Sequence, residues 1–179
     1  KEKNLVENAE ERLVIITPHN EAVRFEFTQG FKKWYKKKTG RTVSIDWRVL
    51  GGTQEIIRYI NSLYDNAFQF YWQKGLARDW NEQVADLFSN DIPIPSDPND
   101  DTFPQSVRRT FLESDVSCGI DLLFGGGELE IKEQAKRAQI VDSGIIQKHP
   151  EWFHENVIPQ QLAGVDIYDP KGLWIGATH

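Results

Sequence analysis

One pattern of apolar and polar residues opens the chain and returns twice more: a short apolar run, a turn, and apolar residues at helical spacing. The first copy begins with residues 13–16 (LVII), a β-branched run with the length of a strand that is buried on both faces. After a turn, four apolar residues recur at spacings of four, four and three: Val23, Phe27, Phe31 and Trp34. That spacing predicts an amphipathic helix with one apolar face.

Both ends of this first helix have clear signals. Asn20 is a good N-cap, and Glu21 lies in the first turn, where the helix dipole favours an acid. Residues 36–38 are lysines that suit the last turn, and Gly40 supplies the stop. Because the helix starts directly after a strand, we expect free backbone N–H groups at residues 19–21, at the strand's carboxyl end, where open α/β sheets bind ligands.

The second and third copies complete the fold prediction. Residues 42–49 alternate in polarity and predict a strand that leads through the turn at 50–53 into an amphipathic helix. Residues 119–124 (GIDLLF) predict a third, buried strand, and a helix begins after the glycines that follow it. Helical crossovers imply parallel strands with right-handed connections. The sequence therefore predicts an α/β fold, a three-layer lobe with a mainly parallel sheet ordered second, first, third.

Residues 65–118 interrupt this repeat. Apolar side chains recur near helical spacing from Phe68 to Leu87, although Gly75 weakens the prediction of a helix there. A loop rich in Pro and Asp follows at 91–101, and a short helix is expected at 106–113. We interpret 65–118 as an insertion carried on the sheet, because it is too short to hold a core of its own comfortably.

Composition narrows the function classes. The chain has 179 residues and a net charge of −6, so bulk attraction to nucleic acid or to an anionic membrane is not expected. Cys118 is the single cysteine, which excludes an intrachain disulfide and favours a buried small hydrophobe. No stretch has the apolar length of a membrane span. The chain contains no methionine, so we expect a processed, trimmed or fragmentary product.

The candidate site lies in the three loops that follow the three predicted strands. In a parallel sheet these loops meet along one edge, and each offers N-terminal amides of a helix. Two of the loops are rich in glycine, which lets a ligand approach the backbone closely. The natural guest is an anion: phosphate, carboxylate, sulfonate or an anion-chelated metal. The candidate ligand-binding residues are His19, Asn20, Glu21, Gly51, Gly52, Thr53, Gly125, Gly126, Gly127 and Glu128.

These residues also have structural interpretations. His19 could cap the first helix as readily as contact a ligand. Glu21 and Glu128 are more often acids that complement a helix dipole than ligands. The glycine triplet at 125–127 is harder to explain in this way, since three consecutive glycines carry a large backbone entropy that folding must overcome. The chain contains no phosphate-binding P-loop motif, no dinucleotide fingerprint and no close pair of zinc-ligand motifs.

Five stretches form a specific combination: TPHNEA, WRVLGGT, IDLLFGGGE, QAKRAQIVDSGI and YDPKGLWIGA. Together they resemble bacterial extracellular solute-binding proteins of ABC importers, most closely the group for iron(III) transport within the type 2 periplasmic-binding-protein fold. The resemblance runs from about residue 13 to residue 179 and leaves out much of 65–118. It implies two α/β lobes that close on a ligand.

The resemblance also implies a domain organisation and a setting. Residues 1–11 would be a flexible lead-in, 12–170 the first lobe with its insertion at 65–118, and 171–179 a hinge strand towards a second lobe absent from this chain. Residues 173–178 would join the sheet beside the third strand. The protein would be a receptor with no catalysis and no resident cofactor, periplasmic or extracellular, either free or membrane-tethered. Its partners would be ABC permease subunits, with no nucleic acid.

Two kinds of cargo fit the resemblance. Iron binders of this family use a His in the first loop, which His19 matches, so iron(III) is one candidate with His19 as a metal ligand. They also use a carboxylate after the third strand, where this chain has glycines and Glu128 comes slightly late, and two tyrosines in the second lobe. Relatives that bind phosphorylated sugars or other anions through the same helix ends fit the residues equally well.

Two alternatives from other classes remain open. The first is a hydrolase of phosphate esters on a flavodoxin-like sheet, assisted by a metal or by His19 and Glu128 as acid and base. Against it, Thr53 is the one nucleophile in the three loops. The second is an interaction module, which predicts an exposed apolar patch around Trp72 and Trp80.

Overall fold

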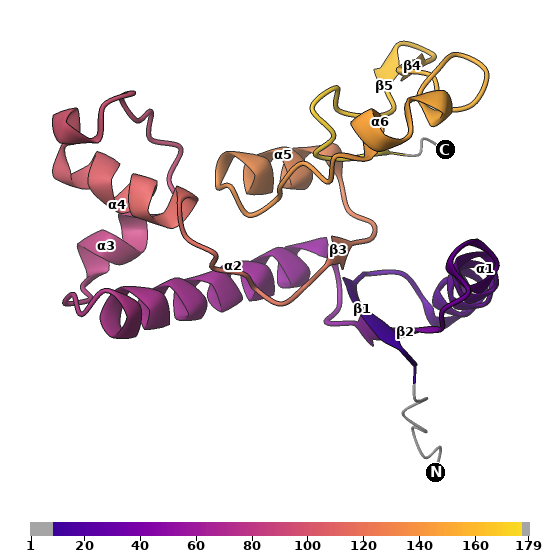
Figure 1. The fold of residues 1–179 in the computed structure, drawn as a ribbon, viewed down its shortest axis with the longest axis horizontal. Coiled ribbons are helices and arrows are strands. Elements are labelled where there is room, and N and C mark those ends of the chain that lie inside the picture. The colour runs from indigo at the N-terminus through magenta and orange to yellow at the C-terminus, as the bar shows by residue number, and fades with distance from the viewer. Residues whose placement is uncertain (1–8, 177–179) are drawn as a thin grey trace. The chain divides into compact units, whose positions relative to one another are not determined.

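The structure, a computed structural model, describes residues 9–176. These form two compact units: a first unit of residues 9–68 and 116–126, and a second unit of residues 69–115 and 127–176. Figure 1 traces the elements of each unit. Residues 1–8 of the predicted lead-in and 177–179 of the predicted hinge strand lie outside the described residues. The predicted domain organisation therefore stays a prediction.

The first unit is built on a parallel sheet of three strands in the order β2-β1-β3 (Figure 1). β1 (Glu11–Ile16) pairs with β2 (Val43–Arg48) along its whole length, with Ile15 opposite Trp47. The last residues of β1 pair with β3 (Leu122–Leu123) on the other side. The α/β class, the parallel direction and the predicted order of these three strands are confirmed.

The first helix, α1 (Glu21–Thr39), begins and ends where the sequence predicts. The Asn20 side chain accepts a hydrogen bond from the backbone N–H of Val23 at 3.1 Å. At the other end Gly40 has a φ of 75°, and its N–H donates to the carbonyl of Lys36. Glycine reaches this left-handed conformation without strain, which is why it stops the helix.

The apolar face of α1 is covered less than its pattern suggests. Trp47 of β2 donates its ring N–H to the hydroxyl of Thr28 at 2.9 Å, so α1 packs on the Trp47 side of the sheet. The Phe27 ring packs against the Phe124 ring, with 4.5 Å between the ring centroids. No residue of α1 is buried, however, and Phe27 and Trp34 are about half-exposed.

The second helix, α2 (Thr53–Phe70), covers the opposite face of the sheet. Ile56 and Ile60 pack against Ile16 of β1 in the core of the first unit. Ile16 and Ile15 point to opposite faces, because side chains alternate along a strand. The carbonyl of Gly52 accepts the first helical hydrogen bond, from Ile56 N–H at 3.1 Å. Two helices on two faces of the sheet give the layered arrangement expected from the sequence.

The third strand differs from its prediction. Residues 119–124 were expected to form a buried strand, but only Leu122 and Leu123 do so, and Leu122 is 46% exposed. β3 lies at the edge of the sheet and has a neighbour on one side only, which leaves part of its surface uncovered. Cys118, expected to be buried, is half-buried.

The second unit is made of short elements. The helix predicted from Phe68 to Leu87 is interrupted, because α2 ends in a π-helical turn and the chain then leaves helical geometry at residues 76–81. The predicted helix at 106–113 starts three residues earlier, after the cap at Thr102. The elements are the π-helix Tyr71–Gly75, α3 (Glu82–Leu87), a 3₁₀ turn Pro98–Asp100, α4 (Phe103–Leu112), α5 (Glu128–Lys136), α6 (Ile145–Lys148), a 3₁₀ turn Pro150–Trp152, β4 (Gln161–Leu162) and β5 (Val165–Asp166).

A buried arginine ties α4 to the end of α5. Arg108 is 4% exposed, and its guanidinium donates to the carbonyls of Phe88, Arg137 and Lys136 at 2.9–3.0 Å. Burial lowers the pKa of Arg108, because removal from water disfavours the charged form. The cation thus satisfies carbonyls at the C-terminus of α5, where a helix supplies no partner for them.

The strand predicted at 173–178 is wrong over its described residues. The turn from Asp169 to Gly172 does form, with Gly172 N–H donating to Asp169 C=O at 2.8 Å. This turn reverses the chain, so Ile175 makes an isolated antiparallel bridge with Tyr168 in place of a strand. A connection from this segment to a second lobe stays a prediction.

Candidate functional site

The three strand-end loops of the first unit meet at Gly125 and Gly126. A Cβ on Gly125 would lie 2.9 Å from His19 Nε2, and a Cβ on Gly126 would lie 3.2 Å from Thr53 Cγ2. Both glycines have a positive φ, 100° and 117°, which other residues rarely adopt. The structure therefore brings His19 and Thr53 against consecutive glycines, as the parallel topology predicts, and glycine is needed there for both space and backbone conformation.

A residue that the sequence did not single out, Thr17, fixes the first loop. Thr17 is fully buried, and its hydroxyl donates to the carbonyl of Phe124 at 2.6 Å. Its oxygen accepts a hydrogen bond from His19 N–H at 3.1 Å. The centroid of the His19 ring lies 4.8 Å from the centroid of the Phe124 ring. A hydroxyl at the end of an apolar strand, just before a proline, was the available signal for this role.

The expectation of free amides in these loops is partly wrong. His19 N–H is taken by Thr17, and Gly52 N–H donates to Glu55 Oε2 at 3.1 Å. The protein satisfies these groups itself, because a backbone N–H left without a partner is unfavourable. In the first turn of α1 the Asn20 side chain also takes Val23 N–H. The amides of Glu21 and Ala22, for which helix geometry supplies no partner, therefore remain for a ligand.

Two acids lie at the helix starts. Glu21 is exposed in the first turn of α1. Glu55 lies three residues after Gly52, holds its amide, and also pairs with Arg58 at 2.7 Å. Both acids complement the positive ends of their helices. Glu55 already holds an N-terminal amide of α2 and would compete with an anionic ligand for it.

Gly127 and Glu128 begin the segment of the second unit that contains α5. Gly127 is the N-cap of α5, and Glu128 forms an ion pair with Lys132 one turn further on. The hydrogen bond to Glu128 raises the pKa of Lys132. Glu128 thus acts on its own helix as a dipole-complementing acid, and a ligand-binding role for Gly127 and Glu128 stays a prediction.

The structure contains no ready-made metal centre in the part of the chain that it describes. Across residues 9–176, no three His, Cys, Asp or Glu side chains gather where they could hold a metal ion.

The tryptophan-rich segment does not form the patch that an interaction module would need. Trp72 is 4% exposed and Trp80 is half-buried. Trp72 donates its ring N–H to the carbonyl of Asp79 at 3.1 Å, so the ring lies within the second unit. The expectation of an exposed apolar patch around these two tryptophans is wrong.

Among residues 9–176, no helix is both long enough and apolar enough to cross a bilayer. No protein-family model, no curated protein and no solved structure matches the chain.

Proposed function

We propose that the chain is a lobe of the solute receptor of an ABC importer, with a fold of the type 2 periplasmic-binding-protein kind. In this proposal the strand-end loops capture an anionic small molecule or chelated iron(III). The observation that carries the proposal is the packing of His19 and Thr53 against the consecutive glycines Gly125 and Gly126. Glycines with this backbone let the three loops pack closely together at the carboxyl edge of a parallel sheet, the edge at which open α/β sheets bind ligands.

The helix ends supply the attraction for an anion. α1 and α2 both start within these loops, and the positive end of a helix dipole favours negative charge. A ligand held by a single lobe would make only part of its contacts. Each missing charge-assisted hydrogen bond corresponds to about 1.5–3 kcal/mol, so the isolated lobe should bind in the millimolar range. Closure of a second lobe by a hinge would supply the rest.

The chemistry of the loops supports a receptor over a hydrolase. Catalysis would need an activated nucleophile with a base within hydrogen-bond reach. The methyl carbon of Thr53 lies nearer than its hydroxyl oxygen to the position that a Cβ on Gly126 would take. The Thr17 hydroxyl donates to a backbone carbonyl, and Glu128 pairs with Lys132. None of these groups is set up to activate water or an ester.

Titrations with defined probes test this proposal. Inorganic phosphate, sulfate and ferric citrate would be added to the full chain and followed by calorimetry and absorption. Hydrolysis of p-nitrophenyl phosphate would be assayed on the same sample. We expect binding of at least one probe without turnover. Turnover that disappears in His19→Ala would contradict the receptor and favour the hydrolase.

The same variant separates the two kinds of cargo. If the guest is a simple anion, the helix amides remain in His19→Ala, and affinity should fall about tenfold, the equivalent of one hydrogen bond. If the guest is iron(III), loss of a ligand should weaken binding far more and change the metal absorption band. His154→Ala removes an exposed histidine of the second unit and is the matched control, with no effect expected.

A further inference from the structure

The second unit contains a hollow of about 440 Å³ beside α4. It lies between the loop at 91–101, one face of α4 and the segment around the π-helix. Its lining residues include Trp72, Arg78, Pro98, Phe103, Ser106 and Thr110. Its volume falls within the range of about 300–1,000 Å³ in which proteins bind small molecules.

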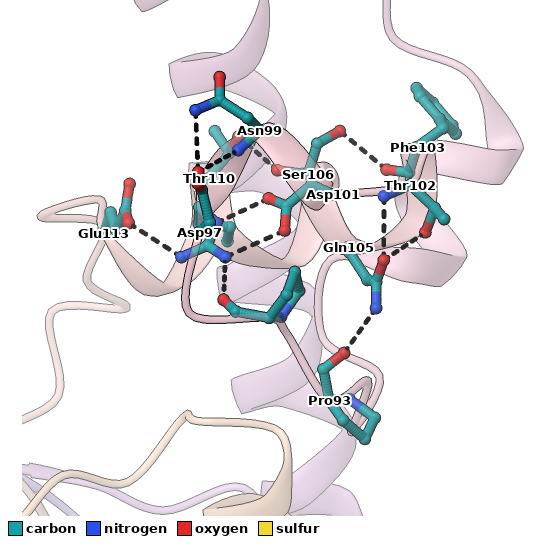
Figure 2. Close-up of polar contacts among 12 residues, drawn as sticks. Pro93, Asp97, Asn99, Asp101, Thr102, Phe103, Gln105, Ser106, Thr110 and Glu113 are labelled. Carbon is teal, nitrogen blue, oxygen red and sulfur yellow. Dashed lines mark hydrogen bonds and ion pairs between the residues drawn. The ribbon is translucent and has the colours of Figure 1, made fainter.

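The loop that forms one wall is fastened to α4 (Figure 2). Arg109 donates through Nε and a terminal nitrogen to both oxygens of Asp101, at 2.6 and 3.0 Å, and also to the carbonyl of Pro95. Gln105 donates to the carbonyl of Pro93 at 3.0 Å. The Arg109 and Asp101 side chains are only 13% and 5% exposed. A bidentate pair with this burial holds the wall in one geometry, so the hollow is formed before any ligand arrives.

The opposite wall has an unusual backbone. Trp72 lies in the π-helix, a conformation that is rare and often found at functional sites. Ala77, the residue before Arg78, has a φ of 52°, which non-glycine residues seldom adopt without a reason. The guanidinium carbon of Arg78 lies 4.9 Å from the centroid of the Trp72 ring. This wall therefore places a cation and an aromatic ring together at the hollow.

The polar groups of the hollow are rich in acceptors. Ser106 donates its hydroxyl proton to the carbonyl of Phe103 at 2.9 Å, and Thr110 donates to the carbonyl of Ser106 at 2.7 Å. With their protons used in this way, both oxygens can only accept from a ligand. The exposed carboxylate of Glu113 adds further acceptors. A guest must therefore present O–H or N–H donors to these oxygens, together with an acceptor for the guanidinium of Arg78, which also lines the hollow.

Charge and shape narrow the class of guest. Two arginines and two carboxylates, Arg78, Arg109, Asp101 and Glu113, line the hollow, and their formal charges cancel. A neutral guest fits this balance better than a cation or an anion. The half-exposed ring of Phe103, together with Pro98, supplies an apolar surface for a flat face of that guest.

We propose that this hollow binds a neutral polyhydroxylated ring, either a free monosaccharide or one sugar unit of an oligosaccharide. Phe103 and Pro98 pack against the apolar face of the ring, while Ser106, Thr110 and Glu113 accept its hydroxyl protons. The site uses none of the strand-end loop residues. The sugar proposal and the receptor proposal can therefore each be wrong without affecting the other.

Saturation-transfer NMR on the full chain tests the proposal, because the method detects millimolar ligands. The sugar probes are D-glucose, D-galactose and maltotriose, and a signal from maltotriose alone would assign the site to oligosaccharides. Tetramethylammonium and inorganic phosphate probe the cationic and anionic classes. We expect saturation of at least one sugar. Phe103→Ala should lower its affinity about tenfold, and Thr110→Val, which keeps the shape but removes an acceptor, about three- to tenfold.

Phe25→Ala is the matched control, since it removes another exposed phenylalanine, from α1 in the first unit, and should leave the sugar signal unchanged. Circular dichroism would verify that each variant is folded. The proposal is overturned if no sugar is saturated, or if the sugar signal is the same in Phe103→Ala and Thr110→Val as in the parent chain. Exclusive binding of tetramethylammonium or phosphate to residues of the hollow would also overturn it.

Discussion

Different interactions stabilise the interior of the first unit and the interior of the second unit. In the first, a parallel sheet buries Ile16 against Ile56 and Ile60, and backbone hydrogen bonds join β1 to both neighbours. In the second, short helices surround an apolar core that includes Trp72, Phe88 and Phe111, and arginine side chains connect these helices to backbone carbonyls. Both units bury apolar side chains, but parallel backbone pairing organises the first, whereas arginine contacts with backbone carbonyls fix the geometry of the second.

This difference between strand pairing in the first unit and arginine–carbonyl contacts in the second predicts how each unit responds to substitution. An apolar core loses stability in proportion to the volume removed and tolerates exchange among similar side chains. A buried guanidinium that serves several carbonyls cannot be exchanged in this way, because its loss leaves all of them without donors. Amide hydrogen exchange read by mass spectrometry resolves peptides from each unit and can therefore test the comparison directly.

The largest effect should come from the core of the first unit. Ile16→Ala removes a fully buried side chain between sheet and α2, and should lower the free energy of unfolding by about 4 kcal/mol. Exchange should accelerate in β1 and in the first half of α2. Ile175→Ala, at a half-exposed isoleucine, serves as the control. Faster exchange confined to α3 and α4 would argue against the core described here.

Substitution of Arg108 should have the second largest effect, in the other unit. Arg108→Met keeps much of the side-chain volume but leaves the carbonyls of Phe88, Lys136 and Arg137 without a donor, which should destabilise the second unit by about 3 kcal/mol. Exchange should rise in α4 and α5 while β1 stays protected. An equal rise in both units would mean that the two do not differ as proposed, and exposed Arg58→Met provides the baseline.

The two units also differ in how much of their structure could be predicted from the sequence. The first unit was largely predictable, because its signals are local: apolar periodicity defines α1 and α2, and Asn20 and Gly40 mark the ends of α1. The role of Arg108 was not predictable, because its three carbonyl partners lie 20 to 29 positions away along the chain. Spacing alone does not show which distant carbonyls a side chain will reach.

The candidate site was predictable in part for the same reason. Parallel strands bring the ends of β1, β2 and β3 to one edge, and this placed His19 and Thr53 beside Gly125 and Gly126. The hydrogen bonds of Thr17 were missed, since they depend on the direction of a side chain within a folded loop. The hydrogen bond from Gly52 N–H to Glu55 had a local signal in the sequence, because Glu55 is an acid three residues after Gly52, the residue at the start of α2.

A smaller, pH-dependent effect should come from the Arg109–Asp101 pair. Arg109 donates two hydrogen bonds to Asp101 and lowers its pKa. The ionised carboxylate therefore stabilises the folded second unit fully above its ordinary pKa of about 3.9, and this contribution is lost as pH falls through the lower folded value. Asp101→Asn should lower the melting temperature at pH 7, and the gap to the parent chain should shrink below about pH 4.

Thermal melts from pH 7 to pH 3 measure that gap, and Glu113→Gln, which removes an exposed and more distant partner of the same arginine, is the comparison. A difference in melting temperature that stays constant across this range would show that Asp101 acts through packing and not through its charge.

The smallest predicted change concerns the ligand site. Glu55 holds Gly52 N–H at the start of α2, so Glu55→Gln should reduce its competition with an anion and raise phosphate affinity about three- to tenfold. Calorimetry at low ionic strength would detect the gain. Glu26→Gln, an exposed acid of α1, controls for the change in net charge. A fall in affinity would mean that Glu55 assists the ligand or organises the loop.

The most direct test of the receptor account is phosphate titration of Gly126→Val in the full chain. Valine at this position would meet Thr53 and would need a φ of 117°, so the loops could no longer admit a ligand. Gly30→Val, at a helical glycine with open space around it, is the matched control. We expect weak phosphate binding by the parent chain and by Gly30→Val, and none by folded Gly126→Val. Equal phosphate affinity in all three proteins would contradict the receptor account, and so would a parent chain that binds none of phosphate, sulfate and ferric citrate.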